Sequence, residues 1–497
     1  MKTLKKILFF STVLVFASCE SATSPDEEVD GEILATMDYP VSDCSTAPAS
    51  WFTLNADGQR VTPMPNEGPT SVFANSTTVT NCDFHRWSWQ KFLWLTNETN
   101  GRPFFLDNMN QVTSSGQFLA KGGDVILEDY GQASGAHDVD FIKTPGTSSL
   151  PSDTVYYSIM ANDKLYGAIK KYGQIAHDSL KKIVDLTFPV GALEMKTAWI
   201  DVAALGKDST TYYITNALIG GATTSKRVAL LGIHVVGIVE NHPEFVWATF
   251  EHDGLVPAYD WSKATPTTDA PVTSTVNYPF FDKSATSTVK NITSATPNHT
   301  DIFSLYKYGT PVVKVLGGES GDDDIMDFMK TSQDGRQNVK NISELNASVK
   351  KQLILAEKDN KNVWQHYFYN GSLWIDMENI DKPAQAELLN ALGGTIGDAN
   401  PTKLPRGSVA AYNITMETYV QAGFGAHSIH GITVDSLASC FACHTTSHYG
   451  SSVNSPLQIS HLFNGYVSSL KGMTKAQIKE EHIATFRANA ILKAIKK

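Results

Sequence analysis

The stretch Cys440-Phe441-Ala442-Cys443-His444, near the end of the chain, is a C-x-x-C-H motif. Its two cysteines are three positions apart, which is close to one helical turn, so both thiols would project from one face of a short helix. Two thiols placed in this way can add to the two vinyl groups of a haem, and the adjacent histidine can bind the iron. The motif therefore predicts one covalent haem c held by Cys440 and Cys443, with His444 as the proximal iron ligand.

Other chemistries use the same cysteines. They could bind zinc together with two nearby histidines, since tetrahedral zinc sites combine thiolates and imidazoles. They could form a thioredoxin-like redox pair, although no βαβ pattern precedes them, or a structural disulfide. The histidines considered for zinc are His427, His430, His444 and His448.

The sequence indicates the second axial ligand of a haem less clearly than the first. Met416, His427 and His430 precede the motif, and His461 and Met473 follow it. A thioether ligand would raise the reduction potential, a second histidine would lower it, and an open position would let a small molecule bind. We rank Met416 first and His427 second, followed by His430 and an open position.

The beginning of the chain predicts export. Three lysines precede an apolar run over residues 7–16, which is too short to cross a bilayer as a mature helix. Residues 15–19, VFASC, resemble a bacterial lipobox, which predicts cleavage after residue 18 and a lipid on Cys19; an ordinary cleaved signal is the alternative. The acidic residues 20–31 would form a solvated tether. We expect a protein anchored to the outer membrane by this lipid alone, on the periplasmic or cell-surface side.

The composition and charge of the chain limit the classes of partner that it is expected to bind. The chain is 42% hydrophobic and 18% charged, as in ordinary globular proteins. Its leader holds three lysines and no acid, so 40 basic residues become 37 against 51 acidic ones, a net charge of −14 after cleavage. This charge argues against nucleic acids and anionic membrane surfaces as partners, and it allows a basic redox protein.

Two further cysteines remain, Cys44 and Cys82, each in a loop-like stretch. In an oxidising compartment two such thiols are expected to pair in a disulfide. The alternative is that they are unrelated cysteines. A bridge would join the N-terminal extension to the first folded element.

The elements that must position the motif are predicted from periodicity. Runs at 194–203, 210–216, 228–239 and 244–251 are β-branched or aromatic and predict strands, close enough in sequence to pair antiparallel. The aromatic stretch 83–97 predicts a helix capped by Asp83, whose aromatic stripe is expected to lie in the core. We expect an α+β fold, with a central, mostly antiparallel sheet, flanking helices and a mainly helical C-terminal haem-bearing segment.

The chain is expected to divide into regions of different character. The central body should be α+β, interrupted by an insertion rich in Ser, Thr and Pro. The expected boundaries are a signal peptide at 1–18, a tether and extension at 19–80, the body at 81–320 with its insertion at 262–300, a helical region at 321–400 and the haem-binding region at 401–497.

Six stretches form a recognisable set: WQKFLWL at 89–95, EMKTAW at 194–199, FVWATFEH at 245–252, VWQHY at 363–367, TMETY at 415–419 and CFACH at 440–444. Together they resemble a family of exported, poorly characterised bacterial cytochrome c proteins, from about residue 81 to residue 465. The resemblance implies a covalent haem c and electron transfer, and it favours Met416 as a ligand. ISHLF at 459–463 departs from the more apolar segment expected there, which singles out His461.

Two function classes follow. The first is a lipid-anchored monohaem cytochrome that transfers electrons in the cell envelope. The alternative is a haem enzyme resembling a peroxidase or oxygenase, with the large body as its substrate domain and Glu194, Glu251 or His252 as acid–base groups. A binding or sensor lipoprotein with a structural haem is a third option. Arg406 and Lys403 are candidate partners for haem propionates.

Overall fold

The computed structural model describes residues 44–75, 77–113, 116–119, 121–128, 154–220, 222–255, 287–288, 303–304, 333–356, 362–375, 381–386, 406–407, 413, 415–416, 426–429, 432–435, 440–444, 446, 453–481 and 483. Residues 1–18, Cys19 and most of 262–300 lie outside these residues. No described helix is both long enough and apolar enough to span a membrane.

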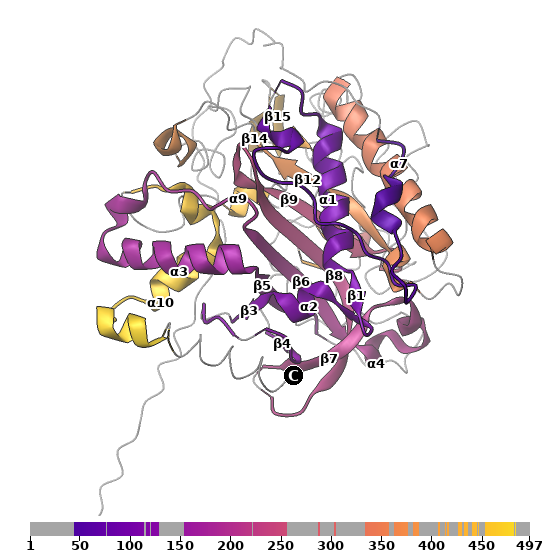
Figure 1. The fold of residues 1–497 in the computed structure, drawn as a ribbon, viewed down its shortest axis with the longest axis horizontal. Helices are drawn as coiled ribbons and strands as arrows, with labels where there is room; N and C mark the ends of the chain where they lie inside the picture. The colour runs from indigo at the N-terminus through magenta and orange to yellow at the C-terminus, as the bar shows by residue number, and fades with distance from the viewer. Residues whose placement is uncertain are drawn as a thin grey trace, which may run out of the picture.

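A nine-stranded sheet forms the centre of the molecule (Figure 1). Its strands are β3 (Asn110–Val112), β4 (Val125–Leu127), β5 (Tyr156–Ala161), β6 (Leu193–Asp201), β7 (Ile214–Ile219), β8 (Lys226–Val239), β9 (His242–His252), β12 (Tyr367–Trp374) and β13 (Arg406–Gly407). They follow the order β13-β12-β9-β8-β6-β5-β3, with β7 beside the start of β8 and β4 beside β7. Every pairing is antiparallel except β4 with β7. The expected mostly antiparallel sheet is confirmed.

The four predicted strands correspond to β6, β7, β8 and β9. The prediction for β7 began too early, because residues before Ile214 form a 3-10 turn, η5 (Gly206–Thr211). A tight turn at Asn241, with φ of 63°, joins β8 to β9. Strand β8 is almost continuously apolar, as expected for a strand covered on both faces. His234 is the half-buried exception in the middle of that run.

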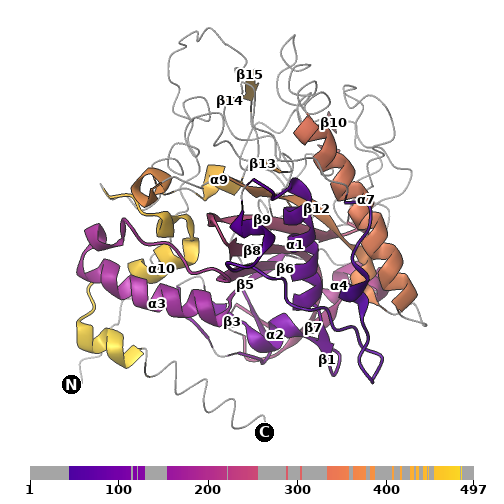
Figure 2. The same cartoon turned by 45° about the horizontal axis from the view of Figure 1, so that its top comes forward.

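Helices cover both faces of the sheet, as the two views show (Figures 1 and 2). On one face, α1 (Asn81–Leu95) and α7 (Gln333–Ala356) pack over one apolar cluster, which includes Trp89, Phe92 and Phe250. On the other face lie α3 (Asp163–Asp178), α10 (His461–Ser469) and the 3-10 turn η12 (Pro456–Ile459). Gly173 lets α3 approach α10, since a Cβ there would lie 2.6 Å from the ring of Tyr466.

Shorter elements complete the described structure. They are η1 (Ala49–Phe52), η2 (Val72–Ala74), β1 (Glu98–Thr99), β2 (Arg102–Pro103), α2 (Phe104–Asn108), η4 (Leu180–Ile183), α4 (Val202–Leu205), β10 (Ser287–Thr288), β11 (Phe303–Ser304), η7 (Val363–His366), β14 (Ala426–Ile429), β15 (Ile432–Asp435) and α9 (Cys440–Cys443). The described part of 401–497 therefore contains short strands as well as helices.

Helix α1 is capped three residues earlier than predicted. Its N-cap is Thr80, and Asp83 is the third helical residue, whose carboxylate accepts the Thr80 amide at 2.8 Å. This capping box explains why an aspartate here suggested a helix start. Cys82, in the first turn of α1, forms a disulfide with Cys44, the pairing expected from the sequence. The aromatic stripe of α1 lies in the core, as predicted.

Candidate haem site

The C-x-x-C-H motif forms one tight turn. Residues Cys440–Cys443 are the helical turn α9, and the His444 amide donates to the Cys440 carbonyl at 2.8 Å. Cys440 is half-buried and is in no disulfide, and Phe441 is fully buried against the sheet. The side chain of Cys443 lies outside the described residues. The helical spacing that the motif requires is present in the backbone.

His444 is oriented by a backbone carbonyl. Its Nδ1 lies 3.1 Å from the carbonyl oxygen of Ile459, in η12. A carbonyl can only accept, so Nδ1 carries the proton and the lone pair of Nε2 is available. Histidines that bind metals usually have this arrangement, because the outer partner fixes both the tautomer and the ring orientation.

Burial keeps His444 neutral. It holds the pKa of His444 well below the ordinary value, and the nearby charge of His461 acts in the same direction. The hydrogen bond to Ile459 opposes these effects without overcoming them. Lys196 and His234, on the sheet, add smaller contributions that also lower the pKa. Neutral imidazole is the form that binds metals, so this environment suits an iron ligand.

Two rings enclose His444. The indole of Trp247, on β9, lies 4.2 Å from its centroid at 46°. The imidazole of His461, the first residue of α10, stacks on it at 4.0 Å and 20°. His461 therefore lies against the face of the His444 ring, beside this candidate ligand.

Met416 lies in a second segment packed on the same sheet face. It is 1% exposed and follows a turn in which its amide donates to the Asn413 carbonyl at 3.1 Å. The Asn413 side-chain amide donates to the Phe250 carbonyl at 2.7 Å, and the Tyr157 hydroxyl donates to the Thr415 carbonyl at 2.7 Å.

A glycine allows this turn to lie flat on the sheet. A Cβ on Gly232 of β8 would lie 2.6 Å from the Asn413 side chain and 2.8 Å from that of Thr415. Contacts below 3.0 Å essentially never occur for real Cβ atoms. The turn before Met416 is therefore tied to the sheet by hydrogen bonds and by close packing.

Strand register arranges the sheet face in three rows. The first row carries Glu194, Val236, Trp247 and Leu373; the second carries Lys196, His234, Thr249 and Gly371; and the third carries Ala198, Gly232, Glu251 and Phe368. Neighbouring rows are two residues, about 6.7 Å, apart along a strand.

The two candidate ligand segments meet different rows. His444 contacts the first row through Trp247, and the turn before Met416 rests on Gly232 in the third. The two segments are therefore separated by the second row, across about 13 Å of sheet. That row carries Lys196, His234 and Thr249, and each neighbouring row also carries one carboxylate, Glu194 or Glu251.

Glu194 anchors the segment that orients His444. It accepts a hydrogen bond from the Ser460 hydroxyl at 3.2 Å, and Ser460 caps α10. Burial raises the pKa of Glu194 to about 7, while Ser460 and Lys196 pull it down. A pKa in this range places the titration of this carboxyl group near neutral pH, beside the segment that contains Ser460 and Ile459.

Glu251 and His252 do not form an acid–base pair. Adjacent residues of a strand face opposite sides of a sheet, so the two groups are separated. Glu251 is 2% exposed on the face of the three rows and accepts from the Asn370 side chain at 3.0 Å. His252, on the other face, stacks on Tyr212 at 3.6 Å.

A second group of possible metal donors lies around His252. Donor atoms of His252, Asp253 and His366 lie within 4.8 Å of one another. They already have partners: His252 Nδ1 accepts from the Gly254 amide at 3.0 Å, and Lys350 Nζ lies 2.7 Å from the Asp253 carboxylate. Burial alone would raise the pKa of Asp253, but hydrogen bonds from His366 and Lys350 lower it to about 2. We interpret the group as a hydrogen-bonded network.

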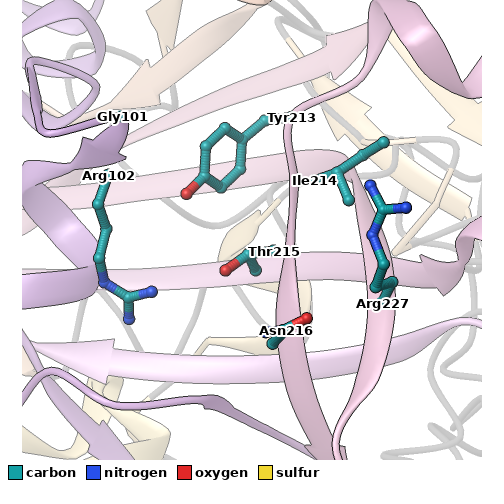
Figure 3. Close-up of a pocket in the computed structure, with 7 residues that line it drawn as sticks. All are labelled: Gly101, Arg102, Tyr213, Ile214, Thr215, Asn216 and Arg227. Carbon is teal, nitrogen blue, oxygen red and sulfur yellow. The ribbon is translucent and has the colours of Figure 1, made fainter.

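One polar pocket of about 280 Å³ lies at the β7 edge (Figure 3). Arg102 and Arg227 flank it, and Tyr213 lines it between them. Arg102 is held by Asp107 at 2.8 Å. Burial raises the pKa of Tyr213 to about 12, so its hydroxyl is neutral. No residue predicted from the sequence to act in a site lines this pocket.

Several predicted site residues lie outside the described part of the structure. Cys19 and His430 are among them, as is His448. His427 is described only through its backbone in β14, which pairs with β15 as a separate ribbon. Arg406 is described through its backbone in β13. The zinc alternative depends on these histidines and on the Cys443 thiol, so it stays a hypothesis.

Three residues of the site were missed from the sequence. Lys196 and His234 lie in strands, and the Ile459 carbonyl belongs to a backbone that carries no sequence signal. A polar residue within the apolar run VALLGIHVVGIV could have indicated His234.

Comparisons with protein-family models, curated proteins and solved structures find no match for this chain.

Proposed function

We propose that the protein is a monohaem c-type cytochrome that transfers electrons in the cell envelope. The carrying observation is the orientation of His444: it ends a C-x-x-C turn, and the Ile459 carbonyl, 3.1 Å from Nδ1, leaves Nε2 for iron. Cys440 and Cys443 would attach the haem, whose iron supplies one-electron chemistry. The segment 401–497 would then be the haem-bearing region.

The chain's own residues fit this task in two ways. Neutral His444 is ready to bind iron without losing a proton, because burial lowers its pKa. Trp247 and buried Phe441 shield the proximal side from water. A low-dielectric surrounding of this kind is one of the means by which proteins tune a haem potential.

We propose Met416 as the sixth ligand. It is buried on the same face as His444, two rows away, in a turn held by the sheet. A thioether ligand suits electron transfer, because it raises the potential. His427 remains the second candidate.

We further propose that a lipid on Cys19 anchors the protein to the outer membrane, as the lipobox-like leader suggests. The acidic mature chain suits a basic redox partner. Replacing Cys19 with Ser should release the protein from the membrane fraction and abolish labelling by a fatty-acid analogue. Unchanged fractionation of C19S would contradict the anchor.

One optical experiment tests the haem proposal. After expression with a haem c maturation system, the purified chain should give a c-type pyridine haemochrome and a reduced spectrum unaffected by carbon monoxide. Cys440→Ala and Cys443→Ala together should abolish covalent haem. The control, Cys44→Ala with Cys82→Ala, should retain it. A wild-type chain without covalent haem would overturn the proposal.

The same spectra test the haem-enzyme alternative. An enzyme resembling a peroxidase or oxygenase needs an iron that binds small molecules, so carbon monoxide should then shift the reduced spectrum strongly. Of the acid–base candidates, His252 lies on the opposite sheet face, Glu194 accepts from Ser460, and Glu251 accepts from Asn370 on the face of the three rows. The response of the reduced spectrum to carbon monoxide therefore decides between the two proposals.

A further inference from the structure

The pocket at the β7 edge presents cationic and neutral hydrogen-bonding groups and no carboxylate. Its volume of about 280 Å³ is slightly below the usual range for drug-sized ligands, so it suits a small molecule. Its polar lining consists of two guanidinium groups, two hydroxyls and one amide, from Arg102, Arg227, Tyr213, Thr215 and Asn216. A lining of this kind is complementary to an anion.

The strand pairing explains why this part of the edge is hollow. Strand β8 pairs with β7 over residues 214–217, whereas β4 pairs with it only over residues 217–219. Among the strands that the structure describes, residues 214–216 therefore have a neighbour on one side alone. The pocket lies along this stretch (Figure 3).

Two arginines approach the pocket from opposite sides of β7. Arg227 pairs with Asn216 across the β7–β8 ladder, so these two side chains lie on one face of the sheet. Tyr213 and Thr215 alternate with Asn216 along the strand and point to the other face. Figure 3 shows Arg102 on that second side. A single ligand in the pocket can therefore meet one guanidinium on each side of the strand.

The donors on the Arg102 side are fixed in place by the protein. Arg102 Nε lies 2.8 Å from the Asp107 carboxylate, and a terminal nitrogen of Arg102 donates to the Gly123 carbonyl. The ring of Tyr213 stacks on Trp364 with centroids 5.2 Å apart. Burial raises the pKa of Tyr213 to about 12, so its hydroxyl keeps a proton at neutral pH. Groups held in this way lose little conformational freedom when a ligand binds.

The carboxylates nearest to the pocket have partners of their own. Asp107 pairs with Arg102, and Glu98 accepts an indole N–H at 2.8 Å. Both are close enough to raise the pKa of Tyr213, but neither lines the pocket. Arg227 is exposed and forms no ion pair with any residue in the described part of the chain. Its charge is therefore available to a ligand.

We propose that this pocket binds a small dicarboxylate, with one carboxylate on Arg102 and the Tyr213 hydroxyl and the other on Arg227. A guanidinium group holds a planar carboxylate through two parallel hydrogen bonds. A compact anion such as phosphate would engage one arginine, whereas a dicarboxylate presents an acceptor to each. This site is separate from the candidate haem site and does not depend on the proposed function.

Isothermal titration calorimetry of the full-length chain tests the proposal, with malonate, succinate and glutarate as probes in a buffer free of carboxylates. At least one of them should bind saturably and about tenfold more tightly than acetate or inorganic phosphate, because it makes a second charge-assisted contact. Arg102→Gln and Arg227→Gln should each remove this tenfold advantage. The control is Lys226→Gln, which alters an exposed lysine next to Arg227, 3.4 Å from Asp201, and should bind as wild type does.

Several results would overturn the proposal. One is the absence of saturable binding of all three dicarboxylates to the wild-type chain. Another is equal affinity for these dicarboxylates and for acetate or phosphate, and a third is wild-type affinity in Arg227→Gln. If Arg102→Gln does not fold because Asp107 loses its partner, Arg227→Gln still decides, since Arg227 is exposed. Covalent haem content is measured separately, so failure of the haem proposal and failure of this one are distinguishable.

Discussion

The imidazole of His444 and the carbonyl of Ile459 are joined by a hydrogen bond of 3.1 Å between Nδ1 and the carbonyl oxygen. His444 directly follows α9 and Ile459 ends η12, and these two elements pack together on one face of the sheet. This one hydrogen bond to a backbone carbonyl fixes the tautomer of His444 and the orientation of its Nε2 atom.

Met416→Ala should convert the haem from six-coordinate to five-coordinate. Without the thioether, the reduced iron should bind carbon monoxide stoichiometrically, and the potential should fall because a ligand that favours ferrous iron is lost. Optical titration and potentiometry would measure both effects. His427→Ala serves as the matched control and should leave the spectrum unchanged. The reverse pattern would assign His427 as the ligand.

Gly232→Ala should destabilise the protein by about 1–3 kcal/mol, because its Cβ would overpack against Asn413 and Thr415. Denaturant unfolding would measure the change. Gly167→Ala is the control: this glycine lies on the exposed side of α3 with nothing within 4 Å of an added Cβ. It should stabilise the helix by roughly 0.5–1 kcal/mol. Equal effects of the two substitutions would show that the turn does not rest on Gly232.

Stability should fall as pH rises from about 4.5 to about 7, through the contribution of Glu194. Its pKa is raised from 4.5 to about 7 on folding, so the native chain retains a proton that the unfolded chain releases. Glu194→Gln should remove this slope and stabilise the protein above pH 7 by on the order of 2 kcal/mol, allowing for partial exposure. Unfolding free energies measured at several pH values would test this. Parallel profiles for wild type and E194Q would contradict it.

Removing the Cys44–Cys82 bridge should lower the free energy of unfolding by about 4 kcal/mol. The bridge spans 38 residues, and closing a loop of that length limits the entropy of the unfolded chain. The double replacement Cys44→Ala with Cys82→Ala should show the loss in denaturant unfolding, while covalent haem content stays unchanged. A stability equal to that of wild type would show that the bridge does not constrain the unfolded state.

The strands could be predicted because their residue types are local signals. The runs that became β6, β8 and β9 are β-branched or aromatic and are bounded by turns. The N-cap of α1 was placed three residues late, because Asp83 was taken as the cap when it closes a capping box with Thr80. The residue types in this stretch correctly predicted a helix but placed its first residue too late.

The site was predictable only where its residues are contiguous. The motif at 440–444 carries its own spacing, so the helical turn before His444 could be expected from it alone. Lys196 and His234 are 38 positions apart in sequence, and only the β6–β8 register brings them together. The Ile459 carbonyl and the stacking of His461 depend on tertiary packing, which leaves no pattern in residue types.

The apolar cluster on the face of the three rows joins Val236, Trp247 and Leu373 of the sheet to Phe441, Leu457 and Phe463 of the C-terminal region. The two regions therefore share one core, and cutting between them would divide it. The consequence concerns the order of folding: this face of the sheet cannot complete its apolar cover before residues 441–463 have been added to it.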